Sequence, residues 1–209
     1  GLARGLAPAL ARTCGGAVLV HAPLSRLVYD LNRAPDHPGA MPATSEIHAV
    51  PGNVDLSPAR RLARIDSIRQ PFHATLSDVV MRIVALGRRP VLMAIHSFTP
   101  VFHGQPRAVE FGILFDDDEA LARAILDAAQ GCGLVTRLNE PYSAQGDVAH
   151  TTRMHAGPLR LRNAMLEIRN DLIADPAAQT AMAARLAPVL SEALIRQGLD
   201  GAPLKKDHR

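Results

Sequence analysis

A histidine at the end of an apolar run is the first residue in this sequence whose type and position suggest chemistry. Residues 91–95 (VLMAI) are continuously apolar and lie between Pro90 and Pro100, and His96 follows them directly. Such a run is typical of a strand covered by helices on both faces, and ligands gather at the carboxyl ends of strands in sheets of this kind. A neutral imidazole there can bind a metal ion or transfer a proton, whereas the ordinary alternative is a hydrogen-bonded structural histidine.

Polar side chains also accompany two other predicted strands. Residues 135–138 read as a short strand that runs into Asn139, which repeats the placement of the histidine. Residues 164–169 alternate between two faces, and Glu167 and Arg169 share one of them. Glu167 therefore lies on a solvated face, pairs with an arginine, or points into a site.

The composition excludes some functions. The chain has 209 residues, of which 47% are hydrophobic and 21% charged, with a net charge of +3 and a pI near 9.3. The positive residues are nearly all arginine and are scattered with few aromatic residues between them, which argues against a nucleic-acid surface. Arginine suits bidentate recognition of carboxylates, although genomic base bias also produces a sequence rich in Ala and Arg.

The cellular setting follows from what the sequence does not carry. No apolar run approaches the length of a membrane span, and the start has no signal-peptide pattern. The two cysteines, Cys14 and Cys132, are too few for a disulfide scaffold and lack metal-ligand spacing. We therefore predict a cytoplasmic protein that does not span a membrane.

The apolar periodicity alternates between helical and extended segments. Helices are predicted over residues 1–12, 58–87, 120–129 and 176–197, and strands over residues 17–20, 27–31, 91–95, 109–115, 135–138 and 164–169. This order predicts an α/β fold, a three-layer sandwich with a mixed, largely parallel central sheet. We expect one domain over residues 1–199, followed by a flexible polar tail over residues 200–209.

Local signals predict several boundaries within this arrangement. Ser57 before Pro58 is an N-cap signal, and Pro71 should kink or divide the helix that follows. The acidic run at residues 116–119 is interpreted as helix capping rather than as a cation site. Residues 34–53 form a long predicted loop that can wall a pocket.

Four separated motifs resemble the N-formylglutamate amidohydrolase family. They are SRLVYDLNR at residues 25–33, IHSFTP at 95–100, NEPYS at 139–143 and LEIRNDLI at 166–173. They occur in order and cover most of the chain. That family is related in fold to the zinc carboxypeptidases and to the aspartoacylase and succinylglutamate desuccinylase group, so the resemblance implies a zinc-carboxypeptidase-like sandwich.

The resemblance also implies a reaction and a set of roles. It implies an amidohydrolase that uses Zn²⁺, or another divalent metal, to cleave a small acidic N-acyl amino acid, in the best-known case N-formyl-L-glutamate to formate and L-glutamate. His96 matches a zinc ligand and Glu167 the catalytic carboxylate that moves the proton. The residues matched to substrate binding are Arg26, Asn32, Arg33, Ser97, Asn139 and Arg169.

The arginines do not all have the same expected role. The Asn32-Arg33 pair is expected to hold the substrate's carboxylate with the arginine fork. Arg26 and Arg169 are candidates for a side-chain carboxylate or for the charge of the tetrahedral intermediate. Structural ion pairing, with Asp30 or Glu167, is the open alternative for both.

One departure from the family pattern leaves alternatives open. The resemblance implies a histidine-glycine motif and an aspartate upstream of the matched region, and this sequence begins with a helix already under way. We therefore expect the chain to lack its natural beginning. The alternatives are a catalytically silent relative that binds carboxylates or regulates, and an amidohydrolase for a different N-acyl amino acid.

Overall fold

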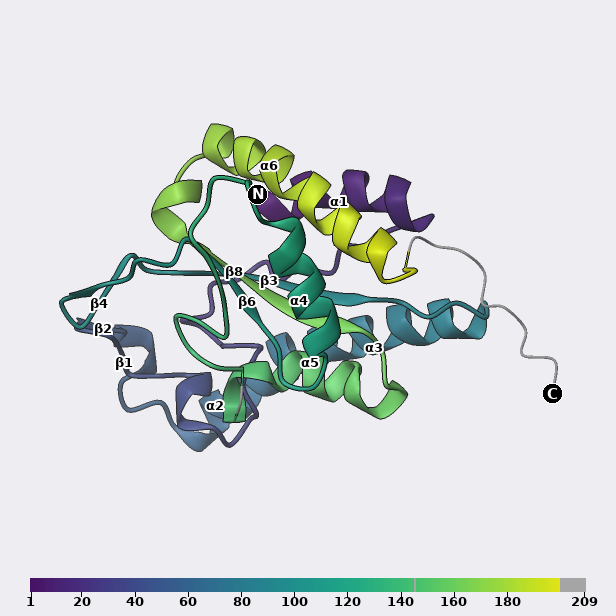
Figure 1. Cartoon of the computed structure of the whole chain (residues 1–209). Helices are drawn as coiled ribbons and strands as arrows, with labels where there is room; N and C mark the ends of the chain where they lie inside the picture. Colours follow the sequence, from purple (N-terminus) through teal and green to yellow (C-terminus); the bar gives the residue numbers. More distant parts are fainter. Residues whose placement is uncertain (145, 200–209) are drawn as a thin grey trace.

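Four strands form the central sheet of the computed structural model, which describes residues 1–144 and 146–199 (Figure 1). The strands are β3 (Leu92–Phe98), β6 (Phe111–Leu114), β7 (Thr136–Leu138) and β8 (Asn163–Arg169), in the spatial order β3-β8-β6-β7. β3 and β8 are parallel, as are β6 and β7, whereas β8 and β6 are antiparallel. The predicted mixed, largely parallel sheet is thus confirmed.

Three helices cover one face of this sheet (Figure 1). They are α1 (Leu2–Cys14), α4 (Glu119–Ala128) and α6 (Pro176–Arg196). Ala164, Leu166 and Ile168 of β8 are fully buried against them, as the alternating pattern predicts. Burying large aliphatic side chains at about 1.5–3 kcal/mol each makes this layer the main source of stability.

Both later helices on this face begin with an aspartate cap. The side chain of Asp175 accepts a hydrogen bond from the backbone N–H of Ala178 at 2.8 Å. Asp118 accepts one from the backbone N–H of Leu121 at 3.2 Å, so the acidic run caps α4 as predicted. Each cap satisfies an amide that the helix itself leaves unpaired.

The opposite face carries α2 (Pro58–Arg64), α3 (Gln70–Ala85) and α5 (His150–His155) (Figure 1). Ser57 caps α2 by accepting from the backbone N–H of Arg60. The segment Ile65–Arg69 between α2 and α3 is a turn of π-helix that ends just before Pro71. Because proline has no N–H to donate to the preceding turn, the wider turn accommodates it. Pro71 therefore changes the type of helix, while the helical run continues from Pro58 to Ala85.

Short elements complete the described chain. Two small hairpins pair β1 (Thr44–Ser45) with β2 (His48–Ala49) and β4 (Val101–Phe102) with β5 (Gln105–Pro106). Single helical turns span Pro38–Ala40, Pro51–Asn53, Gly146–Ala149, Gly157–Leu159 and Asn170–Ile173.

Two predicted strands are wrong. Residues 17–20 run as irregular chain whose apolar side chains line a cavity beside β3 instead of pairing with a neighbour. Residues 27–31 pass through turns and irregular chain. Val28 N–H bonds to the carbonyl of Ser25 at 2.9 Å, and Asp30 N–H bonds to the more distant carbonyl of Ala40 at 2.8 Å. Neither the β-branched composition of residues 17–20 nor the alternation of residues 27–31 therefore produced a strand.

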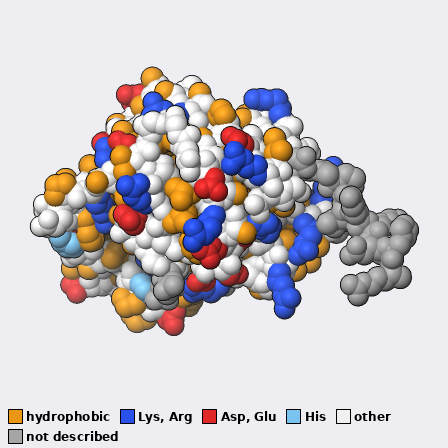
Figure 2. All heavy atoms as spheres, in the orientation of Figure 1, with side chains coloured by type: hydrophobic (Ala, Val, Ile, Leu, Met, Phe, Trp, Pro, Cys, Tyr) orange, Lys and Arg blue, Asp and Glu red, His pale blue; other side chains and the backbone are white. Residues whose placement is uncertain are grey.

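Residues 200–209, the predicted flexible tail, lie outside the described residues. Among residues 1–144 and 146–199, no helix has both the length and the apolar character that crossing a lipid bilayer requires. On the face seen in Figure 2, positive and negative side chains lie interspersed among apolar ones.

Candidate active site

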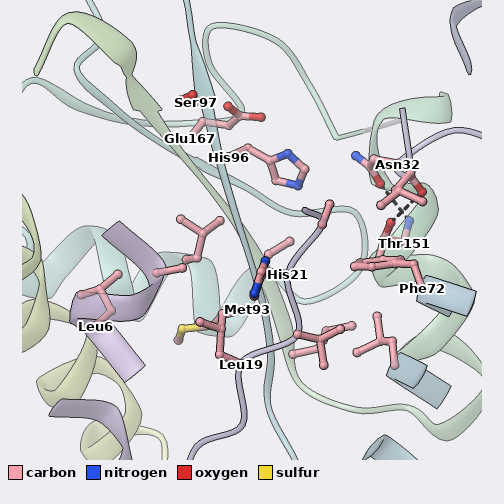
Figure 3. Close-up of a pocket in the computed structure, with 18 of the residues that line it drawn as sticks. Leu6, Leu19, His21, Asn32, Phe72, Met93, His96, Ser97, Thr151 and Glu167 are labelled. Atoms are coloured by element: carbon pink, nitrogen blue, oxygen red, sulfur yellow. Dashed lines mark hydrogen bonds between the residues drawn. The ribbon is translucent and has the colours of Figure 1, made fainter. Parts of the chain in front are cut away.

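A cavity of about 2020 Å³ extends along β3, from α1 to the carboxyl end of β8. Its apolar wall includes Leu6, Leu19, Phe72 and Met93 (Figure 3). Its polar wall includes Arg26, Arg33, His96, Arg107, Tyr142 and Glu167. Ligand pockets commonly combine an extended apolar surface with a few convergent polar groups, so this is the candidate site.

His96 and Glu167 lie side by side on adjacent strands (Figure 3). The parallel register of β3 and β8 places His96 directly opposite Glu167. Because side chains alternate along a strand, both point to the face that carries α3 and α5. Ser97 points to the opposite face and also lines the cavity. The backbone of the sheet therefore fixes the separation of the imidazole and the carboxyl group.

Glu167 is a buried acid. The residue is only 3% exposed, and burial raises the pKa of its carboxyl group to about 7. A hydrogen bond from the phenol of Tyr142 and the charges of Arg26 and Arg107 lower this pKa, but less than burial raises it. Oε2 is buried and has no hydrogen-bond partner among the described residues, so one oxygen of this carboxyl group is an unsatisfied acceptor.

The imidazole of His96 is held neutral by its surroundings. Burial is the main cause that lowers its pKa, and the positive charges of Arg26 and Arg33 lower it further, whereas Asp30 raises it. A neutral imidazole presents one nitrogen lone pair, which can accept a hydrogen bond or bind a metal.

A glycine opposite Glu167 makes room for the loop that carries Tyr142. Gly112 of β6 pairs with Glu167 in the antiparallel register. A Cβ atom at Gly112 would lie 2.2 Å from the backbone oxygen of Glu140 and 3.3 Å from the Cβ of Glu167. The missing side chain thus lets the 140–142 segment pass over the sheet and bring the Tyr142 phenol to the carboxyl group.

The turn at residues 30–33 positions Arg26 and Arg33. Asp30 accepts two hydrogen bonds from Arg26, at 2.7 and 3.1 Å, and one from the backbone N–H of Asn32 at 3.0 Å. Arg33 follows, lines the cavity and acts electrostatically on His96. The Asp30 pairing left open for Arg26 is therefore present, although Arg26 also lines the cavity.

Asn32 acts in the structure as a clamp between that turn and α5. Its Nδ2 donates a short hydrogen bond to the carbonyl of Val148, and its Oδ1 accepts from the backbone N–H of Thr151 at 2.9 Å (Figure 3). The amide is used on both ends by the protein. Asn32 therefore contributes to the site by fixing the turn that ends in Arg33.

Arg107 is a cavity residue that no sequence motif predicted. Its guanidinium lies 4.4 Å from the ring centroid of Phe102, 5.6 Å from that of Phe98 and 5.9 Å from that of Tyr142. Aromatic faces hold a guanidinium in place while its N–H edges remain able to bind a carboxylate. Phe98 and Phe102 belong to the stretch of chain that leads into Arg107, whereas Tyr142 comes from the distant motif at residues 139–143 and is brought there by the fold.

The structure places two other expected site residues away from the cavity wall. Arg169 bonds to Asp171 at 2.8 Å and to Glu110 at 3.4 Å. The Oδ1 atom of Asn139 accepts from the backbone N–H of Phe115 at 3.0 Å. Arg169 serves local structure at the carboxyl end of β8, and Asn139 does so at the opposite end of the sheet, where β6 and β7 end. Within the motif at residues 139–143, Pro141 and Tyr142 line the cavity.

A metal ion at this site would need more ligands than the described residues supply. Among residues 1–144 and 146–199, no group of three His, Cys, Asp or Glu side chains could hold a metal ion. A catalytic zinc usually takes three protein ligands, and the described residues offer His96 with Glu167 beside it. They do not fit a complete catalytic zinc site.

Two solved structures and one family model are similar to this chain. A gene product of Agrobacterium tumefaciens with a crystal structure is 48% identical, with a TM-score of 0.80 over 84% of this chain and 69% of that one. The crystal structure of N-formylglutamate amidohydrolase from Ralstonia eutropha is 18% identical and shares the fold, with a TM-score of 0.52 over 67% of this chain and 57% of that one. A comparison with curated proteins finds no match. The family model of N-formylglutamate amidohydrolase matches residues 3–174, and the chain therefore belongs to that family.

Proposed function

We propose that the protein hydrolyses the amide bond of an N-acyl acidic amino acid, with N-formyl-L-glutamate as the first substrate to test. The observation that carries this proposal is Glu167, a buried carboxyl group with a pKa of about 7 and one unpartnered oxygen, in a cavity whose wall also includes Arg26, Arg33 and Arg107. A base with this pKa accepts a proton near neutral pH and can return it. The family is one of amidohydrolases.

In the proposed reaction, Glu167 removes a proton from a water molecule beside it. The water oxygen then forms a bond to the formyl carbon, and the carbon–nitrogen bond breaks. The proton passes from Glu167 to the leaving nitrogen, which gives formate and the free amino acid. Tyr142 holds the carboxyl group through its phenol hydrogen bond, and the sheet keeps His96 next to it.

The substrate's two carboxylates are assigned to two arginines. Arg33 is proposed to bind the α-carboxylate, because it follows the clamped turn and lines the cavity near His96. Arg107 is proposed to bind the side-chain carboxylate, because its aromatic neighbours hold the guanidinium at the cavity wall. A substrate with two negative groups would thus be held at both ends while its amide faces Glu167.

Binding of zinc, or of another divalent metal, through His96 stays a prediction. The described residues do not supply a complete ligand set, so no step above depends on a metal. Zinc content per chain, measured by elemental mass spectrometry on the purified protein, tests it. Stoichiometric zinc in the wild type that is lost in His96→Ala would support it, and no zinc in the wild type would contradict it.

The activity itself is tested by following formate release from N-formyl-L-glutamate, with and without added zinc. The control is Glu167→Gln, which keeps the side-chain shape and removes the base. We expect release by the wild type and a loss of at least about a hundredfold in the variant. Equal rates would remove Glu167 from its role.

The incomplete ligand set favours a second candidate, a relative that binds dicarboxylates without hydrolysing them. Calorimetric binding of N-formyl-L-glutamate with no formate release in any condition would support that candidate over the amidohydrolase.

A further inference from the structure

Two buried histidines connect α3 and α5 outside the cavity wall. His73 is 3% exposed and His155 is 6% exposed, and their rings stack with centroids 5.1 Å apart. Nδ1 of His73 lies 2.8 Å from Nε2 of His155. Buried polar groups are costly unless they are paired, so the pair must be explained by what each ring bonds.

The hydrogen bonds at both ends fix the direction of the whole chain of bonds. Nε2 of His73 lies 3.1 Å from the carbonyl oxygen of Leu31, which can only accept, so this nitrogen carries the proton. In a neutral ring Nδ1 of His73 is then an acceptor, and Nε2–H of His155 donates to it. Nδ1 of His155 in turn accepts from the hydroxyl of Ser77 at 3.3 Å.

Both rings are kept neutral by their surroundings. Burial is the main cause that lowers the pKa of His73, to about 4, and Arg69, His155 and His150 lower it further. Burial, His150 and Arg69 also lower the pKa of His155. At neutral pH, hydrogen bonds therefore run one way, from Ser77 through His155 and His73 to the Leu31 carbonyl.

The chain of bonds ends at the turn that carries the substrate arginine. Leu31 immediately precedes Asn32 and Arg33, and its carbonyl also accepts from the hydroxyl of Thr151 at 3.3 Å. Asn32 ties the same turn to the start of α5. Without the bond from His73, the turn would keep its hydrogen bonds to α5 and lose its hydrogen bond to α3.

We propose that His73 and His155 are positioning residues that hold the Leu31 carbonyl, and through it aim Arg33 at a carboxylate of the bound substrate. This inference rests on the proposed role of Arg33 in an amidohydrolase site. A loss of positioning would weaken the binding of a carboxylate much more than it slows the chemical step, because Glu167 sits on the sheet and not on the turn.

The experiment compares two substitutions of one residue. His73→Phe keeps a flat ring and removes the donor, whereas His73→Gln keeps an N–H at the position of Nε2. We expect His73→Phe to raise KM for N-formyl-L-glutamate roughly tenfold, the worth of about one hydrogen bond, with kcat within about twofold of the wild type. His73→Gln should restore KM to within about threefold of the wild type.

Binding of glutarate, a dicarboxylate without an amide, gives a readout that does not need turnover. We expect the Kd measured by calorimetry to rise in His73→Phe by the same factor as KM. The tautomer is read separately from the ¹⁵N resonances of the wild-type rings at neutral pH, with His73 protonated on Nε2.

The control for a merely structural role is Ile125→Val, a buried change in α4 on the far face of the sheet. It should lower the melting temperature and leave KM and the glutarate Kd unchanged. If His73→Phe does the same, or if Nδ1 of His73 carries the proton, the positioning role is refuted. If the wild type does not bind glutarate, the positioning role is refuted as well. Glutarate binding without formate release contradicts only the proposed function.

Discussion

Replacing Glu167 by Gln should make the protein more stable at neutral and alkaline pH while it removes the proposed base. The folded state raises the pKa of Glu167 from its ordinary value of 4.5 to about 7. This difference corresponds to about 3 kcal/mol of unfolding free energy. The residue is only 3% exposed, so solvent screens little of this effect.

The sign follows from which state binds the proton more strongly. Below pH 4.5 the carboxyl group is protonated in both states and costs nothing. Between pH 4.5 and about 7 the unfolded chain releases the proton while the folded protein keeps it, so stability falls by about 1.4 kcal/mol per pH unit. Above about 7 the cost is constant, and glutamine never incurs it.

The assay is urea unfolding of both proteins from pH 4 to pH 9, with a chelator present so that folding alone is measured. The two free energies should agree below pH 4.5 and separate to about 3 kcal/mol above pH 7. A constant difference across the range, or a less stable variant at pH 8, would refute the argument that burial of this carboxyl group sets its pKa.

Three further substitutions test the neighbours of Glu167. Tyr142→Phe removes the hydrogen bond that lowers the pKa of Glu167, so the acidic limb of the kcat/KM profile should move to higher pH; an unmoved limb would contradict that contact. Arg107→Met should raise KM for N-formyl-L-glutamate roughly ten- to a hundredfold and leave N-formyl-L-methionine nearly unaffected, as the loss of a charged hydrogen bond predicts, and an equal effect on both substrates would remove Arg107 from carboxylate binding. Gly112→Ala places a Cβ 2.2 Å from the Glu140 oxygen, so urea unfolding should show a loss of about 1–3 kcal/mol, and a loss below about 0.5 kcal/mol would mean that the loop yields freely.

The sequence predicted best those parts of the site that local patterns determine. The apolar run before His96 predicted β3. The alternation around Glu167 predicted which side chains of β8 face α1, α4 and α6. The first prediction depends on a continuous apolar run and the second on the two-residue period of a strand, and both signals are local. The pairing of these two residues across neighbouring strands needed the register, which no local pattern supplies.

The site residues that lie on turns and connecting segments were predicted less well. Asn139 and Tyr142 lie in one short motif, but Asn139 adopts a backbone φ of 49° and bonds to β6, which leaves Tyr142 to reach the carboxyl group. Arg107 depends on aromatic rings from three separate positions. Such contacts are decided by tertiary packing, and the sequence around each residue carries no periodic signal for them.

This division between strands and turns has a consequence for specificity. His96 and Glu167 are fixed by paired strands, so their geometry tolerates little change. Arg33 and Arg107 sit on connecting segments beside a cavity of about 2020 Å³, far larger than a formyl group needs. Changes in those segments can alter which acyl group and which carboxylate are held without moving the carboxyl group that transfers the proton. We therefore expect acyl preference to follow substitutions around Arg33 and Arg107, and the pH dependence of turnover to follow Glu167 and Tyr142.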